Sequence, residues 1–372
     1  MKVAFFIGRL SRGGMETLVL DTFRKRDVAP FDCILVYRND GELTEDYRAT
    51  GVPMYRIKPT ANFFRYVLDL SRLLKREKVD ILHTQTVVNG LIGVVCKLFS
   101  GVRLVSSFHG FLSKFKYKVY THVIMWNADA SVFVSDYERE WYLNHILFAP
   151  KKRSHVVYNG IDFTKFDKHD SVPEFLDNAG SSMPGSLKLS MVGNFVSGRS
   201  QLFLCHALKA LRDRGDCPFV FFFIGKQSEK EPERYDDCYR FCKDNRLLDT
   251  SVFFLGGRGD IPSVLPHLDG FVYCTECDSF GIAVVEAMAA GIPVIVNDWE
   301  VMKEISDNGE FASLYKTLDV EDCVDKIVEL GEHLDERKKK AETVAGIVRN
   351  RFSIENHIRI LDAVYESAMS RS

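Results

Sequence analysis

The stretch from Asp278 to Ile295 places carboxylates, glycines and an apolar run in an order that suits phosphate and sugar binding. Its pattern predicts a loop, a helix, a turn and then a buried strand. Asp278 and Ser279 can cap the helix, and Gly281 lets a ligand approach the backbone closely. Free N–H groups at the start of this helix would then bind a phosphate group.

Glu286 follows about two helical turns after Asp278. Two carboxylates and a helix N-terminus would therefore face one end of a cleft, which suits a ligand with both sugar hydroxyls and a diphosphate. The spacing alone leaves a second interpretation open. Asp278 could be an ordinary N-cap, and Glu286 a surface residue of an amphipathic helix.

Gly13 and Gly14 lie between the first apolar run and the first helical segment, where two glycines let the loop lie against a diphosphate or an acceptor. The pattern Gly-x-Gly-x-x-Gly is absent, which argues against a dinucleotide-dependent dehydrogenase. His109 directly follows an expected strand at 103–108. Because ligands bind at the carboxyl ends of strands in open parallel sheets, we expect a functional role for His109. A single histidine is more often structural, and the case for His83 is weaker.

Short β-branched and aromatic runs alternate with helical segments such as 63–78 and 89–99, and this pattern, typical of a parallel sheet, occurs twice. The first series of expected strands covers 2–7, 31–36, 81–83, 103–108, 131–134 and 155–157. The second series covers 187–192, 219–224, 252–255, 270–273, 293–296 and 311–314.

These two series predict an α/β fold of two facing Rossmann-like domains with a cleft between them. Between them the periodicity fails, and Asp, Pro, Gly and Ser predict a linker. A chain of 372 residues is long enough for two cores. We expect domains at 1–165 and 187–350, a linker at 166–186 and a C-terminal helix within 351–372.

The composition excludes several classes of protein. Hydrophobic residues make up 46% and charged residues 27% of the chain, as in soluble globular proteins. A net charge of -2, from 49 Lys and Arg against 51 Asp and Glu, gives no overall attraction to nucleic acid. The first apolar run is too short for a signal peptide, and no run reaches the roughly 18 apolar residues of a spanning helix, so we expect a cytoplasmic protein.

Nine cysteines without a secretion signal predict reduced thiols rather than disulfides. Cys274 with Cys277, and Cys238 with Cys242, could be imagined as zinc ligands. The first pair abuts a strand end and the second lies one helical turn apart, so we expect no metal site.

The stretch from Asp278 to Ile295 resembles the signature of glycosyltransferase family 4, in which an acid, Phe-Gly, a glutamate and Gly-x-Pro-Val follow in the same order. The resemblance implies the GT-B fold and retaining transfer from a nucleotide-sugar. It also implies that Asp278 contacts the donor sugar, that the backbone amides of Phe280, Gly281 and Ile282 contact sugar and diphosphate, and that Glu286 holds the ribose. The family usually has Glu at the first position, and Asp278 is one methylene shorter.

A second match begins at Gly193. Asn194 and Arg199 align with a family segment whose two cations clamp the donor phosphates. Arg199 matches the lysine and keeps the charge with a planar, bidentate group, whereas Asn194 replaces a cation with a neutral amide. Stabilisation of the leaving group would therefore depend more on Arg199 and the helix N-terminus.

The resemblance covers nearly the whole chain. The family has a similar Gly-Gly loop, and a histidine at the place of His109 that points to the donor sugar. Residues 158–162 resemble the family's segment near the interdomain hinge, and their Asn-Gly pair predicts a turn. The last helix, from about residue 353 to 369, would cross back and pack on the first domain.

Basic and aromatic residues alternate at 111–120, and another helical segment carries Arg65, Arg72, Lys75, Arg76 and Lys78. Such faces could lie on an anionic bilayer and meet a lipid-linked acceptor, although a basic run is usually just a solvated face. A peripheral contact with the inner face of the plasma membrane is therefore one interpretation.

These residues predict a retaining, metal-independent glycosyltransferase of surface polysaccharide biosynthesis that needs no cofactor. Its partners would be a UDP- or GDP-sugar and a saccharide or lipid-linked acceptor, with no nucleic acid. His109, Asp278 and Arg199 would be its catalytic residues. The alternatives are a sugar-nucleotide epimerase or a phosphorylase of the same fold, and a catalytically silent donor-binding subunit, which Asn194 and Asp278 suggest.

Overall fold

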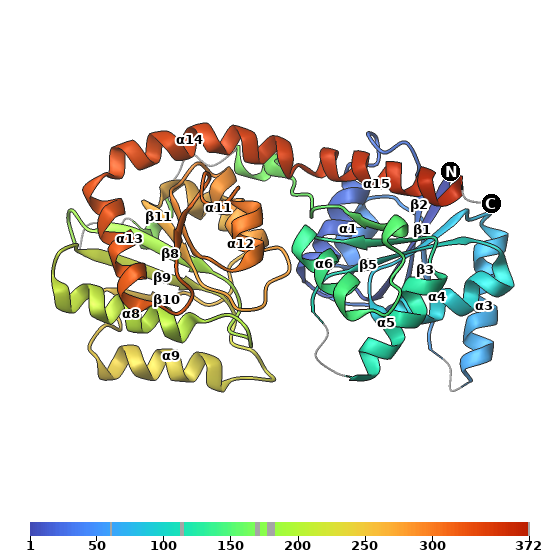
Figure 1. Cartoon of the computed structure of the whole chain (residues 1–372), viewed down its shortest axis with the longest axis horizontal. Coiled ribbons are helices and arrows are strands. Elements are labelled where there is room, and N and C mark those ends of the chain that lie inside the picture. The colour runs from blue at the N-terminus through green and yellow to red at the C-terminus, as the bar shows by residue number, and fades with distance from the viewer. Residues whose placement is uncertain (60–61, 112–114, 168–171, 177–182, 371–372) are drawn as a thin grey trace. The chain divides into compact units, whose positions relative to one another are not determined.

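The chain divides into two compact units (Figure 1). Unit 1 consists of Met1–Asp162 together with Phe352–Ser372, and unit 2 of Phe163–Arg351. The computed structural model describes residues 1–59, 62–111, 115–167, 172–176 and 183–370.

The division between the units falls at residue 162, whereas the sequence placed it at residue 165. The described part of the expected linker belongs to unit 2. Its segments 168–171 and 177–182 lie outside the described residues, as do residues 112–114 of the basic and aromatic run.

The described residues of unit 1 form a seven-stranded parallel sheet in the order β3-β2-β1-β4-β5-β6-β7. Its strands are β1 Lys2–Arg9, β2 Asp32–Asn39, β3 Met54–Arg56, β4 Ile81–Thr84, β5 Arg103–Phe108, β6 Ala130–Phe133 and β7 Ser154–Val156. The strand order reverses between β1 and β4, so the loops after these two strands flank the topological switch point of unit 1.

Alternation along β1 divides the core of unit 1 into two layers. Phe5 packs in one layer with α1 (Gly14–Arg24) and α15 (Ile354–Met369), and Phe6 packs in the other with α3 (Phe63–Arg76) and α4 (Val87–Ser100). Helices thus cover both faces of the sheet, which explains why its strands are nearly continuous apolar runs. The remaining helices of unit 1 are α2 Thr44–Ala49, α5 Phe115–Asn127 and α6 Asp136–His145.

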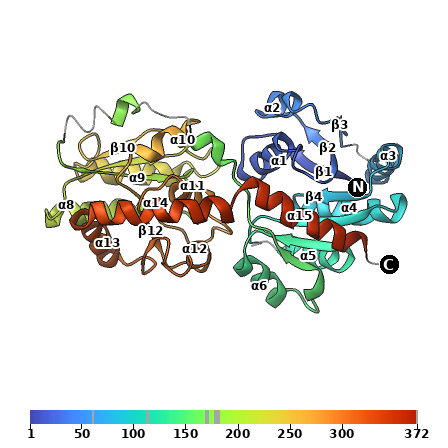
Figure 2. The same cartoon turned by 90° about the horizontal axis from the view of Figure 1, so that it is seen from above.

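Helix α15 is part of the core of unit 1, although it ends the chain (Figure 2). The side chain of Ser353 caps it by accepting a hydrogen bond from the N–H of Asn356 at 3.1 Å. Ile358 and Leu361 are buried against the sheet, and the hydroxyl of Tyr365 lies 2.6 Å from Nδ1 of His83 on β4. Burial of this apolar face stabilises the helix on the sheet.

Unit 2 contains, within its described residues, a six-stranded parallel sheet in the order β10-β9-β8-β11-β12-β13. The strands are β8 Leu187–Val192, β9 Phe219–Ile224, β10 Val252–Phe254, β11 Gly270–Tyr273, β12 Val294–Asn297 and β13 Ser313–Tyr315. The helices are α8 Gln201–Arg214, α9 Glu233–Asp244, α10 Ile261–Val264, α11 Ile282–Ala289, α12 Glu300–Ile305, α13 Val320–Glu332 and α14 Leu334–Arg351. The switch point lies between β8 and β11.

The predicted α/β class with two Rossmann-like parallel sheets is confirmed. The sequence missed β3, because this short strand at the edge of its sheet is only partly buried and lacks an apolar run. Strand β13 begins at Ser313, two positions after the predicted start at Phe311. No helix within the described residues has both the length and the apolar character needed to cross a bilayer.

Candidate functional site

The candidate site lies at the switch point of unit 2, where the loops after β8 and β11 meet. The N–H of Glu276 donates to the carbonyl of Gly198 at 2.9 Å, and the N–H of Ser200 donates to the carbonyl of Cys274 at 3.3 Å. Arg199 and Thr275 pair in an isolated antiparallel bridge. The two loops therefore hold each other in place by backbone hydrogen bonds.

Arg199 and Asp278, two of the predicted site residues, come together at this point. Nε of Arg199 lies 3.9 Å from Oδ1 of Asp278, and both side chains are largely but not completely buried. The hydroxyl of Tyr273 donates a hydrogen bond of 2.5 Å to Oδ2 of Asp278. Each oxygen of the Asp278 carboxylate therefore faces a different partner, which fixes its orientation.

Tyr273 was missed by the sequence analysis, which treated it only as the last residue of an expected strand. Its side chain is completely buried. Burial and the nearby charge of Asp278 raise the pKa of Tyr273 well above its ordinary value. The phenol therefore keeps its proton at neutral pH and remains a donor to the carboxylate.

The start of α11 differs from the prediction. Gly281 is the N-cap, with φ 84° and ψ 57°, and neither Asp278 nor Ser279 caps the helix through its side chain. The expected cap was wrong because the left-handed Gly281 turns the chain into the helix after both residues. A Cβ at Gly281 would also lie 2.7 Å from Cε of Met302.

The first turn of α11 still offers free backbone donors. The N–H groups of Val284 and Val285 both bind the carbonyl of Gly281. Within the described residues, the N–H groups of Ile282 and Ala283 have no hydrogen-bond acceptor. This end can therefore receive an anion. Glu286 lies in the second turn of the same helix and is half-buried.

A completely buried asparagine fixes the loop after β11. Oδ1 of Asn297, at the end of β12, accepts from the N–H of Thr275 at 3.0 Å, and its Nδ2 donates to the carbonyl of Thr275 and to Oγ1 of Thr317, each at 2.8 Å. The sequence analysis missed Asn297. The rule that ligands bind at carboxyl strand ends would have singled it out, since the predicted strand stops one residue before it.

Asn194, the position where the family has a cation, uses its side chain to hold a neighbouring loop. Its Oδ1 accepts a hydrogen bond from the N–H of Lys226 at 3.0 Å. Lys226 directly follows Gly225 at the carboxyl end of β9 and is exposed. The sequence analysis missed this cation, although the same strand-end rule applies to it. Gly193 precedes Asn194 at the end of β8 and leaves room for the guanidinium of Arg199, since an added Cβ would lie 2.9 Å from its Nη1.

The other predicted site residues belong to unit 1. His109 follows β5, and its Nε2 is 2.9 Å from Oε1 of Gln85. Burial, followed by the proximity of His357, lowers the pKa of His109 to about 4. The imidazole is therefore neutral at neutral pH and can exchange hydrogen bonds with a hydroxyl group.

His83 has a structural role in unit 1. Its Nε2 lies 2.7 Å from Oγ of Ser107, and its Nδ1 binds Tyr365, so both ring nitrogens are engaged within the protein. His83, His109 and His357 line one small cavity.

Gly13 and Gly14 mark the start of α1, with Gly13 as N-cap. Gly13 has an extended backbone that any residue adopts, and the atom that an added Cβ would meet is the end of the flexible Glu16 side chain. A Cβ there would lie 2.5 Å from Oε2 of Glu16. Burial raises the pKa of Glu16. A carboxylate so close to this loop disfavours a diphosphate there and favours an acceptor hydroxyl.

The cysteines weighed as zinc ligands occupy ordinary positions. Cys238 and Cys242 are buried on α9 beside Cys205, and Cys277 is exposed. Within the described parts of the chain, no three His, Cys, Asp or Glu side chains form a group that could hold a metal ion.

The GT-B fold of glycosyltransferases consists of two Rossmann-like units, and in this chain a cation, a carboxylate and a free helix N-terminus meet at the switch point of unit 2. Residues 12–165 match the family described as Glycosyltransferase Family 4, and residues 186–333 match Glycosyl transferases group 1. Together these matches span most of the chain. The chain belongs to this family of glycosyltransferases, as the resemblance predicted.

Individual relatives agree with this assignment. The chain is 26% identical over 300 residues to the Escherichia coli UDP-Gal:alpha-D-GlcNAc-diphosphoundecaprenol alpha-1,3-galactosyltransferase, covering 77% of this chain and 76% of that protein. Among solved structures, Anabaena Alr3699/HepE in complex with UDP and glucose has a TM-score of 0.85 at 18% identity, covering 99% of this chain and 100% of that one. A glycosyltransferase from Rickettsia africae has a TM-score of 0.87 at 18% identity, covering 100% and 99%. These structural likenesses show the fold.

Proposed function

We propose that this protein transfers a sugar from a UDP-sugar to a saccharide or lipid-linked acceptor during surface polysaccharide synthesis, with retention of the anomeric configuration. The observation that carries the proposal is the meeting of Arg199, Asp278 and the N-terminus of α11 at one switch point. A cation beside free amides suits a diphosphate, and an oriented carboxylate suits sugar hydroxyls.

The choice of uridine nucleotide rests on relatives. The Escherichia coli relative is named for UDP-galactose and a diphosphoundecaprenol-linked acceptor, and the Anabaena structure holds UDP and glucose. Retention is what the family resemblance implies, and it is tested by the anomeric configuration of the product.

In this proposal the negative charge that develops on the departing diphosphate is balanced by Arg199 and the amides of Ile282 and Ala283, without a divalent ion. Lys226 offers a second cation, which offsets the neutral Asn194. Asp278 binds a hydroxyl of the donor sugar, and Glu286 binds the ribose. In unit 1, the neutral imidazole of His109 suits a hydrogen bond to a sugar hydroxyl.

The acceptor side of the proposal rests on an exposed face of unit 1. Helices α3, α4 and α5 pack side by side, and they expose large apolar side chains, among them Phe64 at 68%, Leu98 at 80% and Trp126 at 49%. Arg65 and Arg72 are exposed on α3 as well, where both pair with Asp69, so the three side chains together carry one positive charge in excess. Apolar side chains beside cations suit an anionic bilayer, where a lipid-linked acceptor would reside.

Vesicle flotation tests this contact. Wild-type protein should float with vesicles containing anionic phosphatidylglycerol and less with neutral phosphatidylcholine. Phe64→Ser should weaken flotation, whereas Ile347→Ser, an exposed apolar residue on α14, should not. Equal flotation of both variants would contradict the assignment of this face.

The transfer reaction itself is tested with a panel of UDP- and GDP-sugars and a lipid-diphosphate-linked sugar as acceptor. The wild type should form a product whose anomeric configuration, read by NMR coupling constants, matches the donor. Asp278→Asn should lower kcat/KM by at least about tenfold, because it removes the charge from a hydrogen-bonded group. Asp325→Asn, an exposed carboxylate on α13, is the matched control. Donor binding without transfer would favour a catalytically silent subunit, and turnover without an acceptor product would favour an epimerase.

A further inference from the structure

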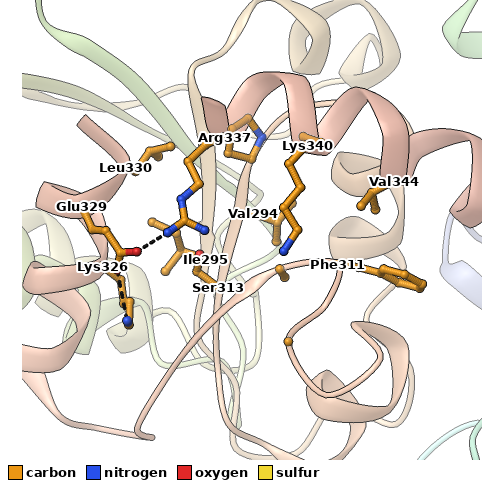
Figure 3. A pocket seen from close by; sticks show the side chains of 14 residues that line it. Val294, Ile295, Phe311, Ser313, Lys326, Glu329, Leu330, Arg337, Lys340 and Val344 are labelled. Atoms are coloured by element: carbon orange, nitrogen blue, oxygen red, sulfur yellow. Dashed lines mark hydrogen bonds and ion pairs between the residues drawn. The ribbon is translucent and has the colours of Figure 1, made fainter. Parts of the chain in front are cut away.

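A hollow in unit 2 lies at the end of the sheet opposite the candidate site. Strands β12 and β13 begin there, at Val294 and Ser313, and helices α13 and α14 close it (Figure 3). Asn297, which holds the loop of the candidate site, ends β12. Because β12 runs from the hollow at its first residue to the candidate site at its last residue, the hollow and the candidate site are separated by the length of the strand.

Small side chains create this hollow. Gly309, Ala312 and Ala341 line it, and Leu330 and Val344 give it apolar walls. Its cavity volume is about 40 Å³. A bound water needs roughly 10–15 Å³ of such space, so the hollow holds about three waters or a group of similar size.

Charged side chains from two helices surround the same space. Nζ of Lys326 lies 3.1 Å from Oε2 of Glu329, and Arg337 pairs with the other oxygen of Glu329. Figure 3 shows both pairs, and it shows Lys340 extending from α14 over the hollow. In the described part of the chain, Lys340 has no ion pair or hydrogen bond through its side chain. The residues that line the hollow therefore include one carboxylate and three cations, which leaves two positive charges in excess.

We propose that this hollow binds the phosphoryl group of a small phosphorylated compound. A phosphate monoester carries up to two negative charges at neutral pH, which matches the excess charge of Lys326, Arg337 and Lys340 over Glu329. The planar guanidinium of Arg337 can meet two phosphate oxygens while Lys340 adds a point charge. Val344 and Phe311 provide apolar contacts for the organic part of the ligand. The hollow therefore combines the size, charge and polarity that a phosphoryl group requires.

Methyl NMR of the full chain, titrated with inorganic phosphate, tests this proposal. Val294, Leu330 and Val344 report on the hollow, whereas Val192 at the end of β8 reports separately on the candidate donor site. We expect saturable shifts of the methyl groups of these three residues, which line the hollow. Lys340→Gln should weaken phosphate binding there by roughly three- to tenfold, because it removes one charge contact from an exposed lysine.

Lys339→Gln is the matched control. Lys339 is an exposed neighbour on the same helix that does not line the hollow, so its loss should change the phosphate affinity by less than about twofold. Arg337→Lys keeps the positive charge but loses the planar guanidinium that can bind two phosphate oxygens, so it should also weaken phosphate binding. Shifts that do not saturate, shifts confined to Val192, or equal losses in Lys339→Gln and Lys340→Gln would each overturn the proposal. Unchanged methyl spectra elsewhere in unit 2 show that the variants are folded.

Discussion

Replacing Tyr273 with Phe removes one hydroxyl and leaves the ring that packs in the core of unit 2. In the wild type, this hydroxyl donates a 2.5 Å hydrogen bond to Oδ2 of Asp278. A hydrogen bond to a charged group contributes about 1.5–3 kcal/mol, which corresponds to roughly 10- to 100-fold in an equilibrium constant. Asp278 is partly exposed, and water can replace part of this interaction, so we expect the lower end of the range.

The structure also predicts which ligand is affected. If Asp278 binds the donor sugar, Tyr273→Phe should weaken binding of the UDP-sugar by about tenfold. Binding of UDP alone, which lacks the donor sugar that Asp278 would contact, should change by less than about twofold. Calorimetry with both ligands measures the two affinities in the same variant.

Tyr315→Phe is the matched control for this measurement. Tyr315 is also fully buried in unit 2, but its hydroxyl donates to the backbone carbonyl of Tyr273 at 2.9 Å rather than to a carboxylate. Its loss should cost about 1 kcal/mol of unfolding free energy and leave the ratio of the two affinities unchanged. The role assigned to Tyr273 would be refuted if Tyr273→Phe kept the wild-type ratio of UDP-sugar affinity to UDP affinity. It would also be refuted if both variants changed this ratio equally.

Three further predictions follow from individual residues. Gly281→Ala should lower the free energy of unfolding, measured in urea, by about 1–3 kcal/mol, because Ala disfavours φ 84°. Gly346→Ala on α14, which has open space around it, should raise the free energy of unfolding by up to about 1 kcal/mol. Equal effects of the two substitutions would contradict this reasoning. Burial lowers the pKa of His109 and of His357 to about 4, below the ordinary value near 6.5, so the unfolded chain binds these protons first. The contribution of these two histidines to the free energy of unfolding should therefore be fully present above pH 6.5 and decrease as the pH falls toward 4. His357→Gln should make the free energy of unfolding depend less on pH in unfolding curves measured across this range. An unchanged pH dependence in this variant would argue against the assigned role of His357. Lys226→Gln should weaken UDP binding by roughly two- to fivefold at low salt and less at high salt, and a loss that does not depend on salt would contradict an electrostatic role.

The sequence predicted most strands because each is a short apolar run between polar segments. The runs at Leu187–Val192 and Arg103–Phe108 match the structure at both ends. The sequence did not predict strand β3, because pairing with β2, rather than an apolar run of its own, makes this segment a strand. The same limit applies to boundaries that depend on tertiary contacts, such as the point after Asp162 where the chain passes from unit 1 into unit 2.

The sequence named residues for the candidate site but not the contacts between them. Arg199 and Asp278 lie close together because they follow β8 and β11, which are neighbouring strands at the switch point. The caps assigned to Asp278 and Ser279 were wrong, since the left-handed backbone of Gly281 moves the helix start. The hydrogen bonds of Tyr273 and Asn297 could not be read from the sequence, because they join residues whose proximity only the folded sheet creates.

The central claim is that Arg199 and the N-terminus of α11 hold the diphosphate of a nucleotide-sugar in unit 2. Calorimetry of UDP with the wild type and Arg199→Ala, with Lys209→Ala on α8 as an exposed cation control, tests it most directly. We predict that the wild type and Lys209→Ala bind UDP with equal affinity and that Arg199→Ala loses at least about tenfold. Equal UDP binding by all three proteins would contradict the claim.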